Sequence, residues 1–150
     1  MFNVRNLIVG DCERVADYFP DDKFDIVVAS EIMEHLCNIG LFLSSVKKIM
    51  HNQSRLVISV PNGVAFRRGL SSLLSRETVH MDHNYYFSKT TITKLLERNN
   101  FEIVEIHGYR ITNKKLFLSF ISDAIANLFS EFACEGIMLT ARLSNPLYSK

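Results

Sequence analysis

The sequence predicts an α/β protein with a mainly parallel sheet. Two short apolar runs, residues 24–29 and 56–60, have the pattern of strands that are covered on both faces. Between them, residues 39–50 carry apolar side chains at helical spacing, and Asn38 is placed to cap the first turn. A strand, a helix and a second strand in this order are typical of a parallel βαβ unit.

The remaining elements follow from the same local signals. We expect residues 6–9 to form a first strand, parallel and adjacent to strands 24–29 and 56–60, and residues 13–18 to form one or two helical turns. Ser88 is a candidate cap for a helix over 89–98, which a half-buried strand at 101–106 follows. An apolar helix over 114–132 then leads to a last strand at 136–143, and the last two strands should form an antiparallel pair at the far edge.

Composition narrows the functional classes. The chain has 150 residues, 47% of them hydrophobic and 22% charged, as in a globular domain, and its net charge of +1 does not favour nucleic acid or an anionic membrane. Its three cysteines show no pairing or metal-type spacing. With no apolar run as long as a signal peptide or a spanning helix requires, we expect a reduced, cytoplasmic protein.

Polar side chains gather directly after the two predicted central strands. Ser30, Glu31, Glu34 and His35 follow the first strand, and the second ends in a Pro-Asn pair at residues 61–62. Ligands of open parallel sheets bind beyond the carboxyl ends of the strands. The sequence therefore predicts a ligand site at this edge.

Four segments together resemble the class I S-adenosylmethionine (SAM)-dependent methyltransferases of types 11 and 23. They are VGDCE at 9–13, FDIVVASEIMEHL at 24–36, LVISVPN at 56–62, and HMDHNYYFSKTTITKLLERNNFEIVEI at 80–106. The resemblance implies a Rossmann-like sheet, SAM as cofactor, and methyl transfer to an oxygen, nitrogen or carbon atom of a small molecule.

The resemblance also implies roles for individual residues. Asp11 and the backbone amide of Cys12 would face the adenine ring, and Ser30, Glu31 and His35 would lie at the methionine end of the cofactor. Independently of the resemblance, the residues themselves suggest that His80 or His83 could act as a general base with Asp82 orienting it. Each residue also has a structural alternative, namely a turn residue, a helix-terminal carboxylate or a polar loop capping the next helix.

A metal site is an alternative for part of this set. On a helical turn, residues three and four apart share a face, so Glu31, Glu34 and His35, with His80 or His83, could hold a divalent cation. This set looks like that of RNA 3′-end 2′-O-methyltransferases. An RNA substrate is not favoured, because the chain shows no basic or aromatic platform for RNA.

One family feature is missing from the sequence. The glycine-rich turn that should hold the amino-acid end of SAM cannot be placed, nor can the acidic residue that should bind the ribose. We therefore expect residues 1–150 to be a single, partial methyltransferase domain, N-terminally truncated and lacking the first two strands. It would be either part of an enzyme or an inactive binding or scaffold subunit, and an oligomer or partner could cover the open sheet.

Overall fold

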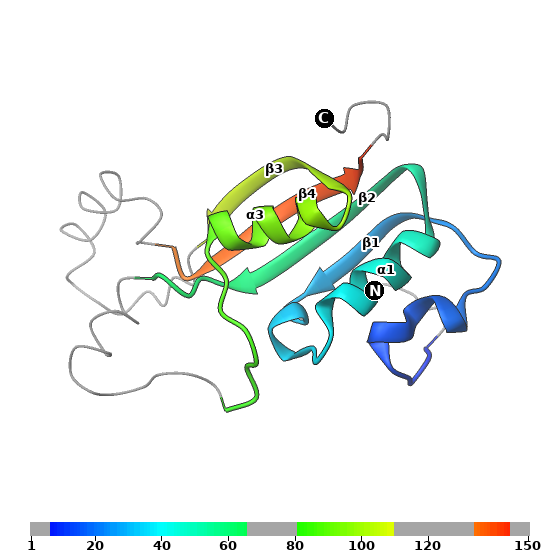
Figure 1. Cartoon of the computed structure of the whole chain (residues 1–150), viewed down its shortest axis with the longest axis horizontal. Helices are drawn as coiled ribbons and strands as arrows, with labels where there is room; N and C mark the ends of the chain where they lie inside the picture. Colours follow the sequence, from blue (N-terminus) through cyan, green and yellow to red (C-terminus); the bar gives the residue numbers. More distant parts are fainter. Residues whose placement is uncertain (1–6, 66–80, 110–133, 145–150) are drawn as a thin grey trace, which may run out of the picture.

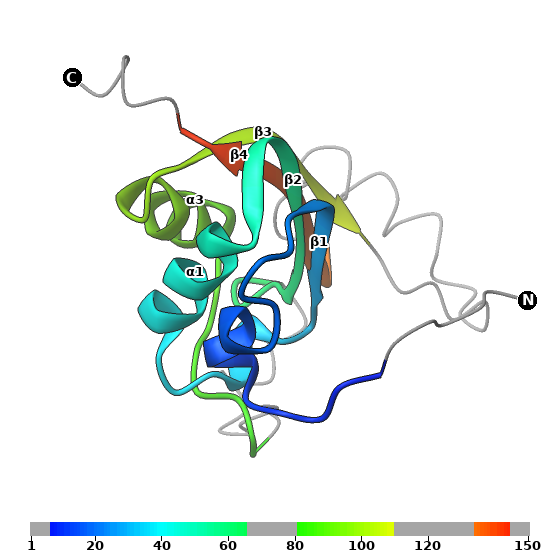
Figure 2. The same cartoon turned by 90° about the vertical axis from the view of Figure 1, so that its right-hand side faces the viewer.

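The computed structural model describes residues 7–65, 81–109 and 134–144. They form one four-stranded sheet with its helices on one face (Figures 1 and 2). In chain order the elements are η1 (Cys12–Tyr18), β1 (Phe24–Ser30), η2 (Met33–His35), α1 (Ile39–Lys48), β2 (Met50–Pro61), α3 (Lys89–Arg98), β3 (Phe101–Tyr109) and β4 (Gly136–Leu143), where η denotes a 3₁₀ helix.

The strand order is β1-β2-β4-β3. β1 and β2 are parallel, with Val27 opposite Leu56 and Ser30 opposite Ser59, and α1 connects them as the crossover helix. β4 lies between β2 and β3 and is antiparallel to both. The predicted βαβ unit and the antiparallel pair at the far edge are therefore confirmed.

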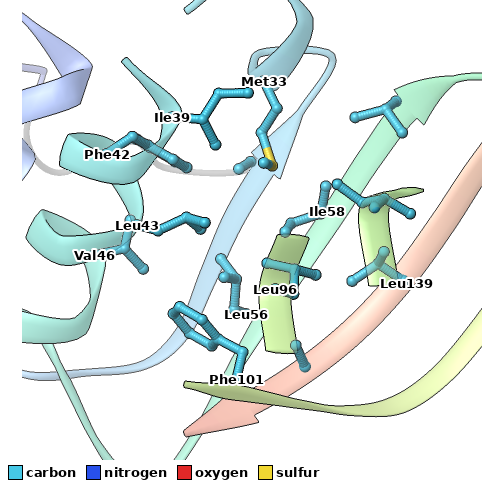
Figure 3. Close-up of a cluster of buried hydrophobic side chains, with 14 of the residues drawn as sticks. Met33, Ile39, Phe42, Leu43, Val46, Leu56, Ile58, Leu96, Phe101 and Leu139 are labelled. Atoms are coloured by element: carbon cyan, nitrogen blue, oxygen red, sulfur yellow. The ribbon is translucent and has the colours of Figure 1, made fainter. Parts of the chain in front are cut away.

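The core lies between the sheet and the helices α1 and α3. Alternate residues of the central strands, such as Leu56, Ile58 and Leu139, are fully buried and belong to one cluster with Phe42 and Leu43 of α1 (Figure 3). Because side chains alternate across a strand, this pattern places one face of the sheet against the helices.

Both predicted helix caps are present. The Asn38 side chain accepts a hydrogen bond from the amide of Leu41 at 2.9 Å at the start of α1. At the start of α3, Ser88 and Thr91 form a reciprocal capping box. These caps satisfy amides that a helix cannot pair internally, which explains why both helices begin at the residues that the sequence indicated.

The prediction of a strand at residues 6–9 is wrong for residues 7–9, which the structure describes. They belong to no strand, and the side chains of Leu7 and Val9 are 86% and 94% exposed. An apolar run becomes a strand only where a neighbouring strand pairs with its backbone. β1 is the edge strand in the described part of the sheet, and residues 7–9 do not pair with its outer edge.

The other face of the sheet is open within the described residues. Ile26 and Val28 of β1 are each 62% exposed, and Val104 and Met138 are 47% exposed. The apolar helix expected over 114–132 lies outside the described residues. No helix in the described ranges is long and apolar enough to cross a bilayer.

Candidate functional site

Glu31 is the centre of a polar cluster at the carboxyl end of β1. Its Oε1 atom accepts hydrogen bonds from the Ser59 hydroxyl and from the Tyr109 hydroxyl, each at 2.9 Å. The Ser30 and Ser59 hydroxyl oxygens lie 2.8 Å apart. A serine has one hydroxyl proton, so Ser59 uses it on Glu31 and Ser30 donates to Ser59.

The backbone of Glu31 is in an unusual conformation. Its φ angle is +52°, in the left-handed region that non-glycine residues rarely adopt, while its amide donates to the Ser59 carbonyl at 2.9 Å. Such a conformation costs on the order of 1–3 kcal/mol and persists where surrounding contacts impose it. The bend turns the chain out of β1 directly at the predicted ligand edge.

The contribution of Ser59 and Tyr109 was missed by the sequence reasoning. For Ser59 the sequence held one signal, because two parallel strands of matched length place it beside Ser30. Tyr109 had none, because it ends β3 and is separated from Glu31 by 78 residues and by two intervening strands.

The Tyr109 phenol should titrate late. Burial, followed by the hydrogen bond and the charge of Glu31, raises its pKa to about 12. A raised pKa means that folding favours the neutral phenol. The resulting stabilisation is therefore fully present below the ordinary pKa of about 10 and is lost as the pH rises toward 12.

We therefore expect one of the five tyrosines to ionise at a pH well above the ordinary tyrosine pKa. The Tyr109→Phe variant should lose this late step of the titration curve. Ultraviolet absorbance of the phenolate, followed against pH, measures it. The exposed Tyr86 provides the matched variant, Tyr86→Phe, which should keep the late step. A wild-type curve that is complete near the ordinary tyrosine pKa would contradict the Tyr109–Glu31 contact.

A second cluster contains Glu34, His35 and His83. One ligand atom from each lies within 4.8 Å of the other two, and the Glu34 side chain is only 1% exposed. The His35 and His83 rings are in edge-to-face contact with centroids 4.7 Å apart. Two imidazoles and a carboxylate are ligands that zinc and manganese accept in proteins.

The orientation of His35 suits metal binding. Its Nδ1 atom lies 3.0 Å from the Asp82 carbonyl oxygen, which can only accept, so Nδ1 carries the proton in this contact. The neutral ring then has its lone pair on Nε2, the atom that lies 4.0 Å from Glu34 Oε1. A backbone carbonyl that fixes the tautomer in this way is a common outer contact of metal-binding histidines.

The loop that carries His83 is fastened to η2. The Asn84 amide donates to the Glu34 carbonyl at 2.7 Å, and the Asn84 side-chain amide donates to the carbonyls of His35 and Leu36 at 3.0 and 3.2 Å. These contacts explain why two segments separated by nearly fifty residues place their ionisable side chains together.

The structure separates Glu31 from the other described residues of the predicted metal site. Glu31 was expected to share a helical face with Glu34 and His35, but its left-handed backbone separates it from η2, which begins at Met33. Glu31 instead contacts Ser59 and Tyr109. His80 lies outside the described residues, and His83 is the loop histidine found in the cluster.

Asp11 and Cys12 lie at the start of η1. The Asp11 carboxylate accepts from the amide of Glu13 and its own amide donates to the Tyr18 hydroxyl, each at 2.9 Å. Asp11 thus has the structural role of a cap, which leaves its second carboxylate oxygen available to a ligand. Cys12 is an exposed free cysteine. Their contact with a cofactor stays a prediction, as does a shared cleft for Asp11, Ser30, Glu31 and His35.

A family model described as "Methyltransferase domain" matches residues 4–106. Ubiquinone biosynthesis O-methyltransferases are among the relatives: that of Bartonella bacilliformis is 26% identical over 102 residues, covering 64% of this chain and 40% of that protein. The match to that of Bradyrhizobium diazoefficiens is 33% identical over 51 residues, 34% of this chain and 20% of that protein. The chain thus spans less than half the length of these relatives.

Solved structures support the same fold. A SAM-dependent methyltransferase from Archaeoglobus fulgidus superposes with a TM-score of 0.63 at 19% identity, covering 91% of this chain and 67% of that chain. The small RNA methyltransferase HEN1 superposes with a TM-score of 0.52 at 19% identity, over 82% of this chain and 14% of that chain. By its family match and its fold, this chain belongs to the methyltransferase domain family and has the Rossmann-like α/β architecture of SAM-dependent methyltransferases.

Proposed function

We propose that this chain binds SAM at the carboxyl ends of β1 and β2 and takes part in methyl transfer to a small-molecule acceptor. The observation that carries the proposal is the fixed Glu31 carboxylate, held by Ser59 and Tyr109 where the parallel strands end. Family membership supplies the cofactor class, and the ubiquinone O-methyltransferase relatives favour an oxygen acceptor over nitrogen or carbon.

The residues of this edge fit such a cofactor. Bound SAM supplies a methyl group on a positively charged sulfur, and a carboxylate at Glu31 would complement that charge. Ser30 and His35 would orient the rest of the methionine moiety, while Asp11 and Cys12 would contact the adenine. Most of the rate acceleration would come from positioning, which needs no protein nucleophile.

His83 is the base candidate that lies among described residues. In its neutral form it would accept the proton that a hydroxyl acceptor loses as its oxygen bonds to the methyl carbon. Its ring contacts that of His35, beside the Glu34 carboxylate, so a positive charge on His83 would have a buried counter-charge nearby. His80, three residues earlier in the sequence, is the alternative base in this proposal.

A nuclear magnetic resonance (NMR) titration of the whole chain with SAM tests the proposed location. We expect the amides of residues 29–35 and 59–62 to shift, since these segments end the two parallel strands. Amides at the opposite end of the sheet, near Lys23 and Arg55, provide the internal control and should stay in place. Shifts confined to that opposite end, or no shifts at millimolar SAM, would contradict the proposal and favour a scaffold role without cofactor.

A divalent cation at Glu34, His35 and His83 is the second candidate for this region, and the cluster geometry favours it specifically. Ligand atoms bind zinc at about 2.0–2.2 Å, so the half-exposed His83 and exposed His35 would close slightly around the ion. Such a cation would bind the acceptor oxygen and lower its pKa, taking over part of the work of a general base.

We expect the whole chain to bind Zn²⁺ or Mn²⁺, and His83→Ala to weaken that affinity at least about tenfold because one of three protein ligands is lost. Isothermal titration calorimetry measures this loss. The matched control is His107→Ala, because His107 is an exposed histidine paired with Glu105 at 3.1 Å on β3. Equal affinities for the wild type and the His83 variant would exclude this site.

The same cation would also suit a nucleotide 2′-hydroxyl. The HEN1 likeness concerns the fold alone, whereas the sequence relatives named above act in ubiquinone biosynthesis, so we favour the small-molecule acceptor.

The proposal also includes a second chain or partner along the outer edge of β1, where Ile26 and Val28 are exposed.

A further inference from the structure

The Tyr109 ring lies directly over Gly136. The two residues are opposite each other on β3 and β4, and a Cβ atom at position 136 would lie only 2.1 Å from Cζ of Tyr109. Gly136 has no positive φ angle, so its backbone would accept any residue. The absence of a side chain is therefore required by the ring above it and not by the backbone.

This arrangement lets Tyr109 reach across the sheet. Although β4 and β2 lie between β3 and β1, the Tyr109 hydroxyl donates to Glu31 Oε1 at 2.9 Å. The Ser59 hydroxyl donates to the same oxygen. Two donors on one oxygen fix the direction of the carboxylate and leave Oε2 available for a ligand. They also help to hold Glu31 in its left-handed backbone conformation.

We propose that Tyr109 is a positioning residue, which uses the space above Gly136 to hold the Glu31 carboxylate toward the positive sulfur of bound SAM. This inference rests on the proposed function and adds to it one residue from β3, at the opposite edge of the sheet, and one from the neighbouring strand β4. The two strands that follow α3 thereby contribute to a site built on β1 and β2.

The proposal predicts a specific electrostatic signature. SAM carries a positive charge on sulfur, whereas S-adenosylhomocysteine (SAH), the product, is neutral there. An oriented carboxylate favours SAM over SAH, and a freely rotating carboxylate screened by water favours it less. Loss of Tyr109 should therefore reduce the preference for SAM, which a general loss of stability would not do.

The test uses NMR titrations of the whole chain with SAM and with SAH, because NMR can measure dissociation constants in the millimolar range. We expect Tyr109→Phe to weaken SAM binding about fivefold or more and SAH binding distinctly less, through loss of one hydrogen bond to a charged group. Tyr86→Phe removes the same atom from an exposed tyrosine and should leave both affinities unchanged.

A second variant displaces the ring and keeps its hydroxyl. Gly136→Ala should cause a similar loss in SAM affinity, and the double variant with Tyr109→Phe should lose little more, because both changes break one contact. Gly40→Ala is the control, since its nearest neighbouring atom, Asn38 Oδ1, would lie 3.5 Å from the new Cβ.

The outcomes separate the two proposals. If the wild type binds SAM and Tyr109→Phe keeps both its affinity and its SAM-to-SAH ratio, the positioning role is overturned and the proposed function stands. If the wild type shows no SAM-dependent shifts, the proposed function fails, and the positioning role fails with it. Additive losses in the double variant would also overturn the shared contact.

Discussion

Phe101→Ala is expected to lower the free energy of unfolding by about 3–5 kcal/mol. Phe101 is the first residue of β3, is 1% exposed and belongs to the same buried cluster as Leu56 and Leu96 (Figure 3). Removing its ring loses the transfer free energy of a large apolar group and leaves a cavity that the packed side chains of the surrounding cluster prevent from closing.

Urea unfolding followed by circular dichroism measures this loss. Val104→Ala is the matched control on the same strand, because Val104 is 47% exposed and its change should stay within about 0.5 kcal/mol. Phe101→Leu keeps most of the volume and should fold even if the alanine variant does not. Equal destabilisation by Phe101→Ala and Val104→Ala would show that Phe101 is not part of the core.

The elements that the sequence predicted correctly have strong local signals. Asn38 and Ser88 begin α1 and α3 because their side chains bond to the first free amides. The continuous apolar run of β1 correctly predicted a strand, but the expected cover on both faces is wrong for the described residues, because Ile26 and Val28 are 62% exposed. The alternation in β3 correctly predicted a half-buried strand. The segment at 7–9 has a similar local signal but no strand beside it, so local apolarity predicted a strand that the described fold does not form.

The candidate site shows the same division between local and long-range information. The placement of Ser30 and Glu31 at a strand end follows from the strand itself. Glu34 and His35 both lie in η2 with ligand atoms within 4.8 Å of each other, whereas one backbone angle separates Glu31 from them. Tyr109 could not be found from the sequence, because its contact depends on the sheet register and on a glycine 27 positions later.

This chain is expected to bind SAM only weakly, with a dissociation constant well above the micromolar range. Its six glycines, at positions 10, 40, 63, 69, 108 and 136, include no pair separated by a single residue, so the sequence supplies no glycine-rich turn. No acidic residue can be assigned to the ribose hydroxyls either. Each missing charged hydrogen bond costs about 1.5–3 kcal/mol, and several together lower affinity by orders of magnitude.

Isothermal titration of the whole chain with SAM decides this prediction. The ubiquinone biosynthesis O-methyltransferase of Bartonella bacilliformis, of which this chain covers 40%, serves as the reference protein measured alongside. A micromolar dissociation constant for this chain would show that another of its segments replaces the glycine-rich turn. Because Glu31 and its two hydroxyl donors are already in place, the weak affinity should come from the missing turn and ribose contacts, and Glu31→Ala should weaken it further.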